Sequence, residues 1–95
     1  MKMFWFKFEK LPRPTIINLG VGVSAYNYDD AIVLLRERMF GPNGPPVIEE
    51  CLENVKMEDL EKNHVLPNIG NHLIRGVWFP QGYETPLLYE RMDKM

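Results

Sequence analysis

The sequence is poor in cysteine and histidine and carries no excess of positive charge. Its 95 residues include one cysteine, Cys51, and two histidines, His64 and His72. A single cysteine excludes an internal disulfide and a zinc cluster of several cysteines, and it favours an intracellular chain. The formal charge is −2, from 11 basic and 13 acidic residues, so the chain offers no positive field to phosphate backbones. We therefore expect no nucleic-acid partner.

The sequence also lacks a long apolar run. The longest aliphatic run, residues 31–35, is far shorter than the roughly 20 residues that span a bilayer. Charged residues interrupt the amino-terminal segment, which therefore does not have the pattern of a signal peptide. We expect a cytoplasmic chain that does not enter a membrane. The composition, 45% hydrophobic and 25% charged, predicts one globular domain over residues 1–95.

Two segments near the amino terminus alternate between apolar and other residues, with the period of two that is typical of a strand. They are residues 3–9 and residues 16–26. The prolines at positions 12 and 14 cannot continue a strand pairing, because proline lacks the backbone donor. We therefore predict that the two strands form an antiparallel hairpin.

The two apolar stripes of this hairpin align in one register. That register sets Phe8 opposite Ile17, Phe6 opposite Leu19 and Phe4 opposite Val21. On the other face it sets Trp5 opposite Gly20, a strand position without a side chain on which the indole can lie. A slip of one residue would move every side chain to the wrong face.

A helical period begins after Asn27, which we predict to be the N-cap. The apolar residues of this segment share one helix face, and they are Tyr28, Ala31, Ile32, Leu35 and Met39. Gly41 and Pro42 form the stop signal. We expect one amphipathic helix packed on the hairpin.

Residues 47–55 fit both a helix and a strand. Prolines before the segment suit a first helical turn, whereas a third strand would complete a β-α-β unit over a core that a two-stranded ribbon leaves marginal. We choose the strand. We expect residues 73–79 to form the last strand at a sheet edge, and residues 84–95 to be peripheral. The predicted fold is α+β, a ββαβ-like sheet with one helix on one face.

Three residues are candidates for catalysis or metal binding, namely His64, His72 and Cys51. No helical turn presents the two histidines together as a metal pair, so a metal site needs other ligands to converge in the fold. A cysteine nucleophile needs a lowered pKa, and the glutamates around Cys51 raise it instead. We therefore predict no catalytic residue, no metal and no cofactor.

Two groups of residues favour a contact surface. Aromatic surfaces on small proteins often mark interfaces, and the aromatic residues concerned are Trp5, Trp78, Phe79 and Tyr83. A covered second face of the sheet is the other interpretation of the same residues. The acidic stretch includes Glu49 and Glu53, and it is either a solvated face or a surface for a basic partner.

Three segments of the chain are distinctive, namely HVLPNIG at 64–70, RGVWFP at 75–80 and SAYNYDDA at 24–31. In these segments the chain resembles a family of short bacterial proteins that has no assigned activity. The resemblance covers most of the chain. It implies a bacterial, cytoplasmic setting and contributes no catalytic residues.

We expect a non-enzymatic protein that binds another protein, or a second copy of itself, through the aromatic face or an open sheet edge. An immunity-like or antitoxin-like inhibitor is a narrower alternative, suggested by small size and mild acidity. A small enzyme or metal protein that uses His64, His72 and Cys51 is an alternative of a different class.

Overall fold

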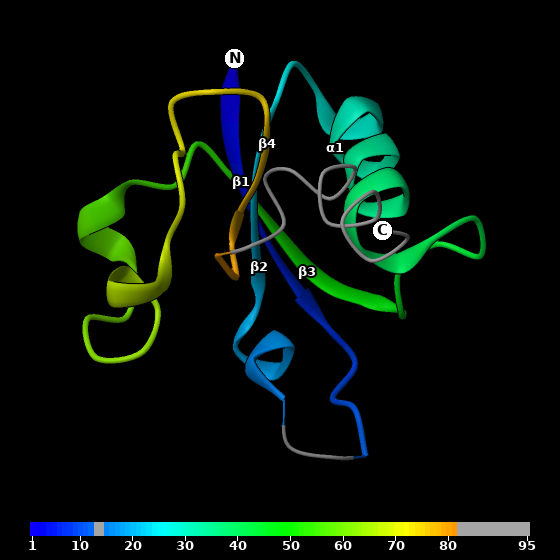
Figure 1. The fold of residues 1–95 in the computed structure, drawn as a ribbon, viewed down its shortest axis with the longest axis horizontal. Coiled ribbons are helices and arrows are strands. Elements are labelled where there is room, and N and C mark those ends of the chain that lie inside the picture. The colour runs from blue at the N-terminus through cyan, green and yellow to red at the C-terminus, as the bar shows by residue number, and fades with distance from the viewer. Residues whose placement is uncertain (13–14, 82–95) are drawn as a thin grey trace, which may run out of the picture.

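The computed structural model describes residues 1–12 and 15–81. Within these residues the chain forms an antiparallel sheet of four strands in the order β3-β1-β2-β4, with α1 on one face (Figure 1). The strands are β1 (Lys2–Phe8), β2 (Val21–Ala25), β3 (Ile48–Glu53) and β4 (Gly76–Phe79), and the helix is α1 (Tyr28–Leu35). No helix in this part of the chain is long and apolar enough to cross a membrane. The predicted α+β class with one helix is confirmed.

The first two strands pair as an antiparallel hairpin, but the predicted register is wrong by two residues. Phe4 lies opposite Val23, and Phe6 lies opposite Val21. Trp5 lies opposite Gly22 instead of Gly20. Because side chains alternate with a period of two, a shift of two keeps every residue on its predicted face. The three phenylalanines therefore still face the helix.

The register differs because the second strand begins later than predicted. Residues Ile16–Leu19 form a 3₁₀ turn, in which the Thr15 hydroxyl accepts a hydrogen bond from the Ile17 amide at 3.3 Å. The Asn18 side chain accepts another from the Leu11 amide at 2.9 Å. Such local bonds compete with strand pairing. Gly20 then adopts a φ of +131°, which favours glycine, and β2 starts at the next residue.

The helix begins as predicted. Asn27 is its N-cap and accepts a hydrogen bond from the Asp30 amide at 2.8 Å. After α1 the chain continues as a π-helical turn, Arg36–Phe40, and stops at Gly41. The buried face of α1 includes Leu34, which was not part of the predicted apolar face. Tyr28, which was part of that face, is 44% exposed.

Residues 47–55, which fit both a helix and a strand in the sequence, contain the strand β3, as predicted. β3 pairs antiparallel with β1 on the side away from β2. It follows that β2 and β3 are parallel with β1 between them, so that β2, α1 and β3 form a β-α-β unit split by one strand. The last predicted strand is also present at an edge, although it starts at Gly76. Residues 84–95 lie outside the described residues.

The sheet is covered on both faces. The core beneath the helix consists of Phe4, Phe6, Phe8, Val21, Val23, Ala25, Ala31, Leu34, Leu35 and Val77. On the other face, a segment over residues 54–75 crosses the sheet opposite α1 (Figure 1). This cover segment contributes Leu60 and Val65 to a second core with Trp5, Trp78 and Phe79.

Candidate functional site

The aromatic residues predicted as an interaction surface lie in the interior. Trp5 is 5% exposed, and Trp78 and Phe79 are fully buried. The ring centroids of Trp5 and Phe79 are 5.4 Å apart. An exposed aromatic face built on these three residues is therefore wrong, and the alternative of a covered face is what the fold contains. Tyr83 lies outside the described residues.

Two tryptophans fill the places that glycines leave on β2 and next to it. A Cβ at Gly20 would lie 2.5 Å from the Trp5 ring, and one at Gly22 would lie 2.4 Å from the Trp78 ring. The predicted contact between Trp5 and Gly20 therefore exists, although the two residues are diagonal neighbours. The two indoles lie so close to the backbone that a residue with a Cβ at position 20 or 22 would clash with them.

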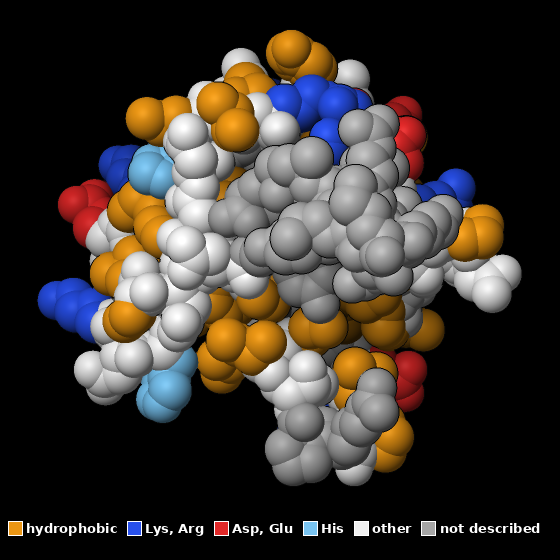
Figure 2. Space-filling view, in the orientation of Figure 1, with side chains coloured by type: hydrophobic (Ala, Val, Ile, Leu, Met, Phe, Trp, Pro, Cys, Tyr) orange, Lys and Arg blue, Asp and Glu red, His pale blue; other side chains and the backbone are white. Residues whose placement is uncertain are grey.

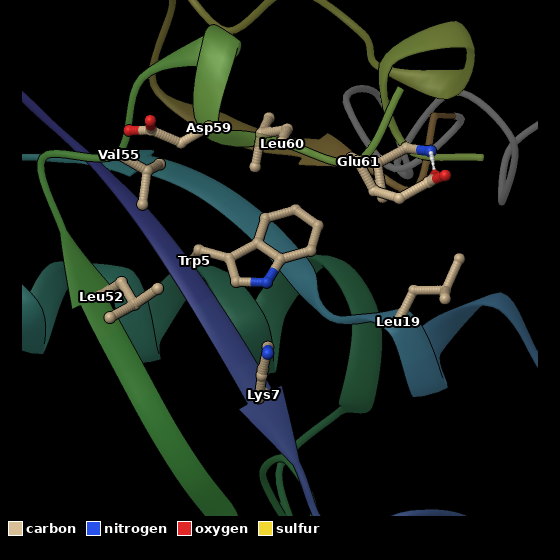
Figure 3. A pocket seen from close by; sticks show the side chains of 9 residues that line it. Trp5, Lys7, Leu19, Leu52, Val55, Asp59, Leu60 and Glu61 are labelled. Carbon is tan, nitrogen blue, oxygen red and sulfur yellow. Dashed lines mark hydrogen bonds between the residues drawn. The ribbon is translucent and has the colours of Figure 1, made fainter. Parts of the chain in front are cut away.

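A pocket of about 240 Å³ lies between the sheet and the cover segment. Its lining residues are Trp5, Lys7, Leu19, Leu52, Val55, Asp59, Leu60, Glu61 and Val65. The sheet supplies Trp5 and Lys7 from β1 and Leu52 from β3 (Figure 3). The cover segment supplies the opposite wall. Six of the nine lining residues are apolar, and the other three, Lys7, Asp59 and Glu61, are charged.

The acidic groups of the pocket differ in their surroundings. The Glu61 carboxylate accepts hydrogen bonds from the backbone amides of Asn63, His64 and Val65. These bonds, that of His64 foremost, hold the pKa of Glu61 below its ordinary value. In Figure 3 the carboxylates of Asp59 and Glu61 both point away from the Trp5 indole. The hydrogen bonds of the Glu61 carboxylate therefore stabilise the turn at residues 61–65.

One edge of the sheet is open and acidic. Within the described part of the chain no strand lies beyond β3, and its side chains Glu49, Glu50 and Glu53 are exposed. Glu53 is 3.4 Å from the Lys2 ammonium. At the other edge, the Gly70 amide donates a hydrogen bond to the carbonyl of Trp78. The cover segment thus caps β4, whereas no segment of the described chain caps β3.

The three residues considered for catalysis or metal binding, Cys51, His64 and His72, lie in different environments. Cys51 lies opposite Phe6 and packs on the core beneath the helix. Its pKa is raised, first by burial and then by the charge of Glu53. The His64 ring is exposed and lies 3.3 Å from Glu61, whereas His72 packs edge-on against Trp78.

The two histidine side chains appear at separate places in Figure 2. In the ranges 1–12 and 15–81 no three histidines, cysteines or acids form a group that could hold a metal ion. The structure therefore does not bring these residues together as a site.

An ion pair that the sequence pattern did not indicate joins the helix to the last loop. Arg75 Nε donates to Asp30 Oδ2 at 3.0 Å, and its terminal nitrogen contacts Oδ1. Asp30 also accepts from the Tyr26 amide. The hydrogen bond with Arg75 is the main cause that lowers the pKa of Asp30. This pair fixes the start of α1 against the strand that follows Arg75.

Comparison of the chain with protein-family models, curated proteins and solved structures finds no match.

Proposed function

We propose that this chain is a non-enzymatic binding protein that takes an extended segment of a partner protein as an added strand on β3. The observation that supports this proposal is the open edge itself. β3 is a six-residue strand at the end of the sheet, and its outer backbone groups have no neighbouring strand among the described residues. A strand that docks there gains a row of backbone hydrogen bonds.

The charge of the edge selects the partner. Glu49, Glu50 and Glu53 stand on one strand, so a second copy of β3 would bring like charges together, which disfavours self-pairing. A segment that carries lysine or arginine would be attracted and oriented by the same charges. Leu52, 45% exposed, adds an apolar contact beside them. We therefore favour a basic partner over the homodimer that an open edge also allows.

An immunity-like or antitoxin-like inhibitor is one form of this proposal, and its target would then present a basic extended segment. The small-enzyme alternative has no such support, because Cys51 packs on the helix-side core while the His64 ring is exposed and pairs with Glu61.

The test uses two synthetic peptides with the same alternating valine and threonine pattern, one with three lysines and one with three glutamates. We expect the lysine peptide to bind and to slow amide hydrogen exchange along β3. Equal binding of both peptides, or binding without protection of β3, would contradict strand addition directed by charge.

A pair of double variants separates the edge from general acidity. Replacement of Glu49 and Glu50 by glutamine is expected to weaken binding of the lysine peptide, whereas replacement of Glu37 and Glu58 should not. All four side chains are exposed, and each double variant removes two negative charges. Equal loss in both variants would assign the effect to net charge instead of to β3. Light scattering of the free chain is expected to give a monomer.

A further inference from the structure

The pocket beside Trp5 has the construction of a small-ligand site, and it does not involve the outer edge of β3. Its walls come from both strands and loop, so it exists only when the cover segment lies on the sheet. Its volume is about 240 Å³. An apolar cavity of ~150 Å³ is enough for benzene, so this pocket has room for one aromatic ring with a short substituent.

Two polar groups lie next to each other on the β1 wall of the pocket, the indole Nε1–H of Trp5 and the ammonium of Lys7 (Figure 3), and both are hydrogen-bond donors. Trp5 is 5% exposed, yet its Nε1–H has no hydrogen-bond partner among the described residues. In Figure 3 this nitrogen lies on the side of the ring that faces Lys7. The Lys7 ammonium also lacks an ion-pair partner in that part of the chain. Among the described residues the fully buried side-chain donor without a partner is Trp78 Nε1 and not Trp5 Nε1. The Trp5 donor therefore opens onto the pocket, where a ligand with an acceptor group would take the place of water.

The acidic residues near the pocket do not prevent it from binding a ligand that carries acceptor groups or a negative charge. The Glu61 carboxylate is occupied by three backbone amides, and that of Asp59 points away from the indole. Glu50 lies opposite Lys7 on β3, without approaching it as an ion pair in the described chain. Lys7 thus retains a charge that is available to an anion, and the acid opposite it on β3, Glu50, is the group that would compete with that anion.

We propose that this pocket binds a small aromatic carboxylate. Its ring would lie among Leu19, Leu60 and Val65, and its carboxylate would accept from Trp5 Nε1 and from the Lys7 ammonium. Charge-assisted hydrogen bonds of this kind are stronger than neutral ones, and the flat indole suits an aromatic ring. The class of ligand follows from these contacts: one apolar ring and one negative charge.

The probes are phenylacetate, phenylacetamide and phenethylamine, which share the ring and differ in charge. The readout is the indole Nε1–H resonance of Trp5 in a ¹H–¹⁵N spectrum, with the resonance of the fully buried Trp78 as internal reference. We expect phenylacetate to shift the Trp5 resonance saturably and to bind about tenfold more tightly than the amide. No shift at millimolar phenylacetate, or tighter binding of the amine, would overturn the proposal.

Three variants identify the groups responsible. Lys7→Gln is expected to remove the preference for carboxylate over amide, whereas Glu50→Gln should strengthen carboxylate binding. Leu19→Trp, at an exposed position of the lining, is expected to fill the pocket and abolish the shift by all three probes. Carboxylate binding that is unchanged in Lys7→Gln would refute the assigned contacts. Leu19 and Lys7 lie outside β3, so failure here leaves strand addition on β3 untouched.

Discussion

The indole of Trp78 lies directly on the backbone of Gly22. A Cβ at Gly22 would be 2.4 Å from the far edge of the ring, and both residues are fully or nearly fully enclosed. Because the ring cannot move outward without leaving the second core, Gly22→Ala is expected to overpack the interior and destabilise the fold by about 1–3 kcal/mol. Urea denaturation would measure the change.

The control for this prediction is the same substitution against a smaller neighbour. In a Trp78→Leu background the added methyl group no longer meets the indole, so Gly22→Ala should be less harmful than in the natural chain. Additive effects in the double variant would show that the close approach of Trp78 is not what requires glycine.

The pair of Asp30 and Arg75 predicts a dependence of stability on pH. The folded pKa of Asp30 is lowered, chiefly by its hydrogen bond with Arg75. A carboxyl whose pKa is depressed by folding stabilises the fold above its unfolded pKa, about 3.9, and loses this contribution as the pH falls through the folded value. Arg75→Gln is therefore expected to destabilise at pH 7 by about 1 kcal/mol. The difference from the natural chain should shrink below pH 4.

Asp29 provides the matched control, because it is an exposed acid in the same helical turn. Asp29→Asn should leave the difference between the natural chain and Arg75→Gln unchanged at every pH. An Arg75→Gln variant that is as stable as the natural chain at pH 7 would contradict the role assigned to the pair.

The thiol of Cys51 should react slowly in the folded chain. Its pKa is raised by burial and by Glu53, and only the thiolate is an efficient nucleophile. We expect iodoacetamide at pH 8 to label the folded chain more slowly than the chain in denaturant. Glu53→Gln should increase the labelling rate, but by less than unfolding does. Glu50→Gln, on the opposite face of β3, should leave the labelling rate unchanged. Fast labelling of the folded chain would contradict the packing of Cys51.

The faces of the hairpin could be predicted from sequence, but its register could not. The alternation of Phe4, Phe6 and Phe8 fixes which side chains meet the helix, and a shift of two residues preserves that assignment. The register depends on where β2 begins. That point is set by hydrogen bonds of Thr15 and Asn18, which are local contacts that the apolar pattern of residues 16–19 does not contain.

The candidate pocket was not predictable from periodicity, because one of its walls is irregular chain. Leu60 and Val65 belong to a segment with only short 3₁₀ turns, so no repeat marks them as buried. The apolar residues from position 55 to position 69 were the available signal, since six of them pack in or against the second core, namely Val55, Met57, Leu60, Val65, Leu66 and Ile69. The outward aromatic residues required a cover, and this segment supplies it.

The cover segment gives the last prediction. Val65, 2% exposed, packs against the second core and lines the pocket, so Val65→Ala removes apolar contacts on Trp5 and leaves a cavity. We expect a loss of about 1–3 kcal/mol in the free energy of unfolding. Faster amide exchange over residues 54–70 should accompany it, while α1 keeps its protection. Leu73→Ala, at a residue that is 75% exposed, should change neither quantity. If Val65→Ala instead loosened α1 and the cover segment equally, the two faces of the sheet would form one cooperative unit, and the pocket could not open without global unfolding.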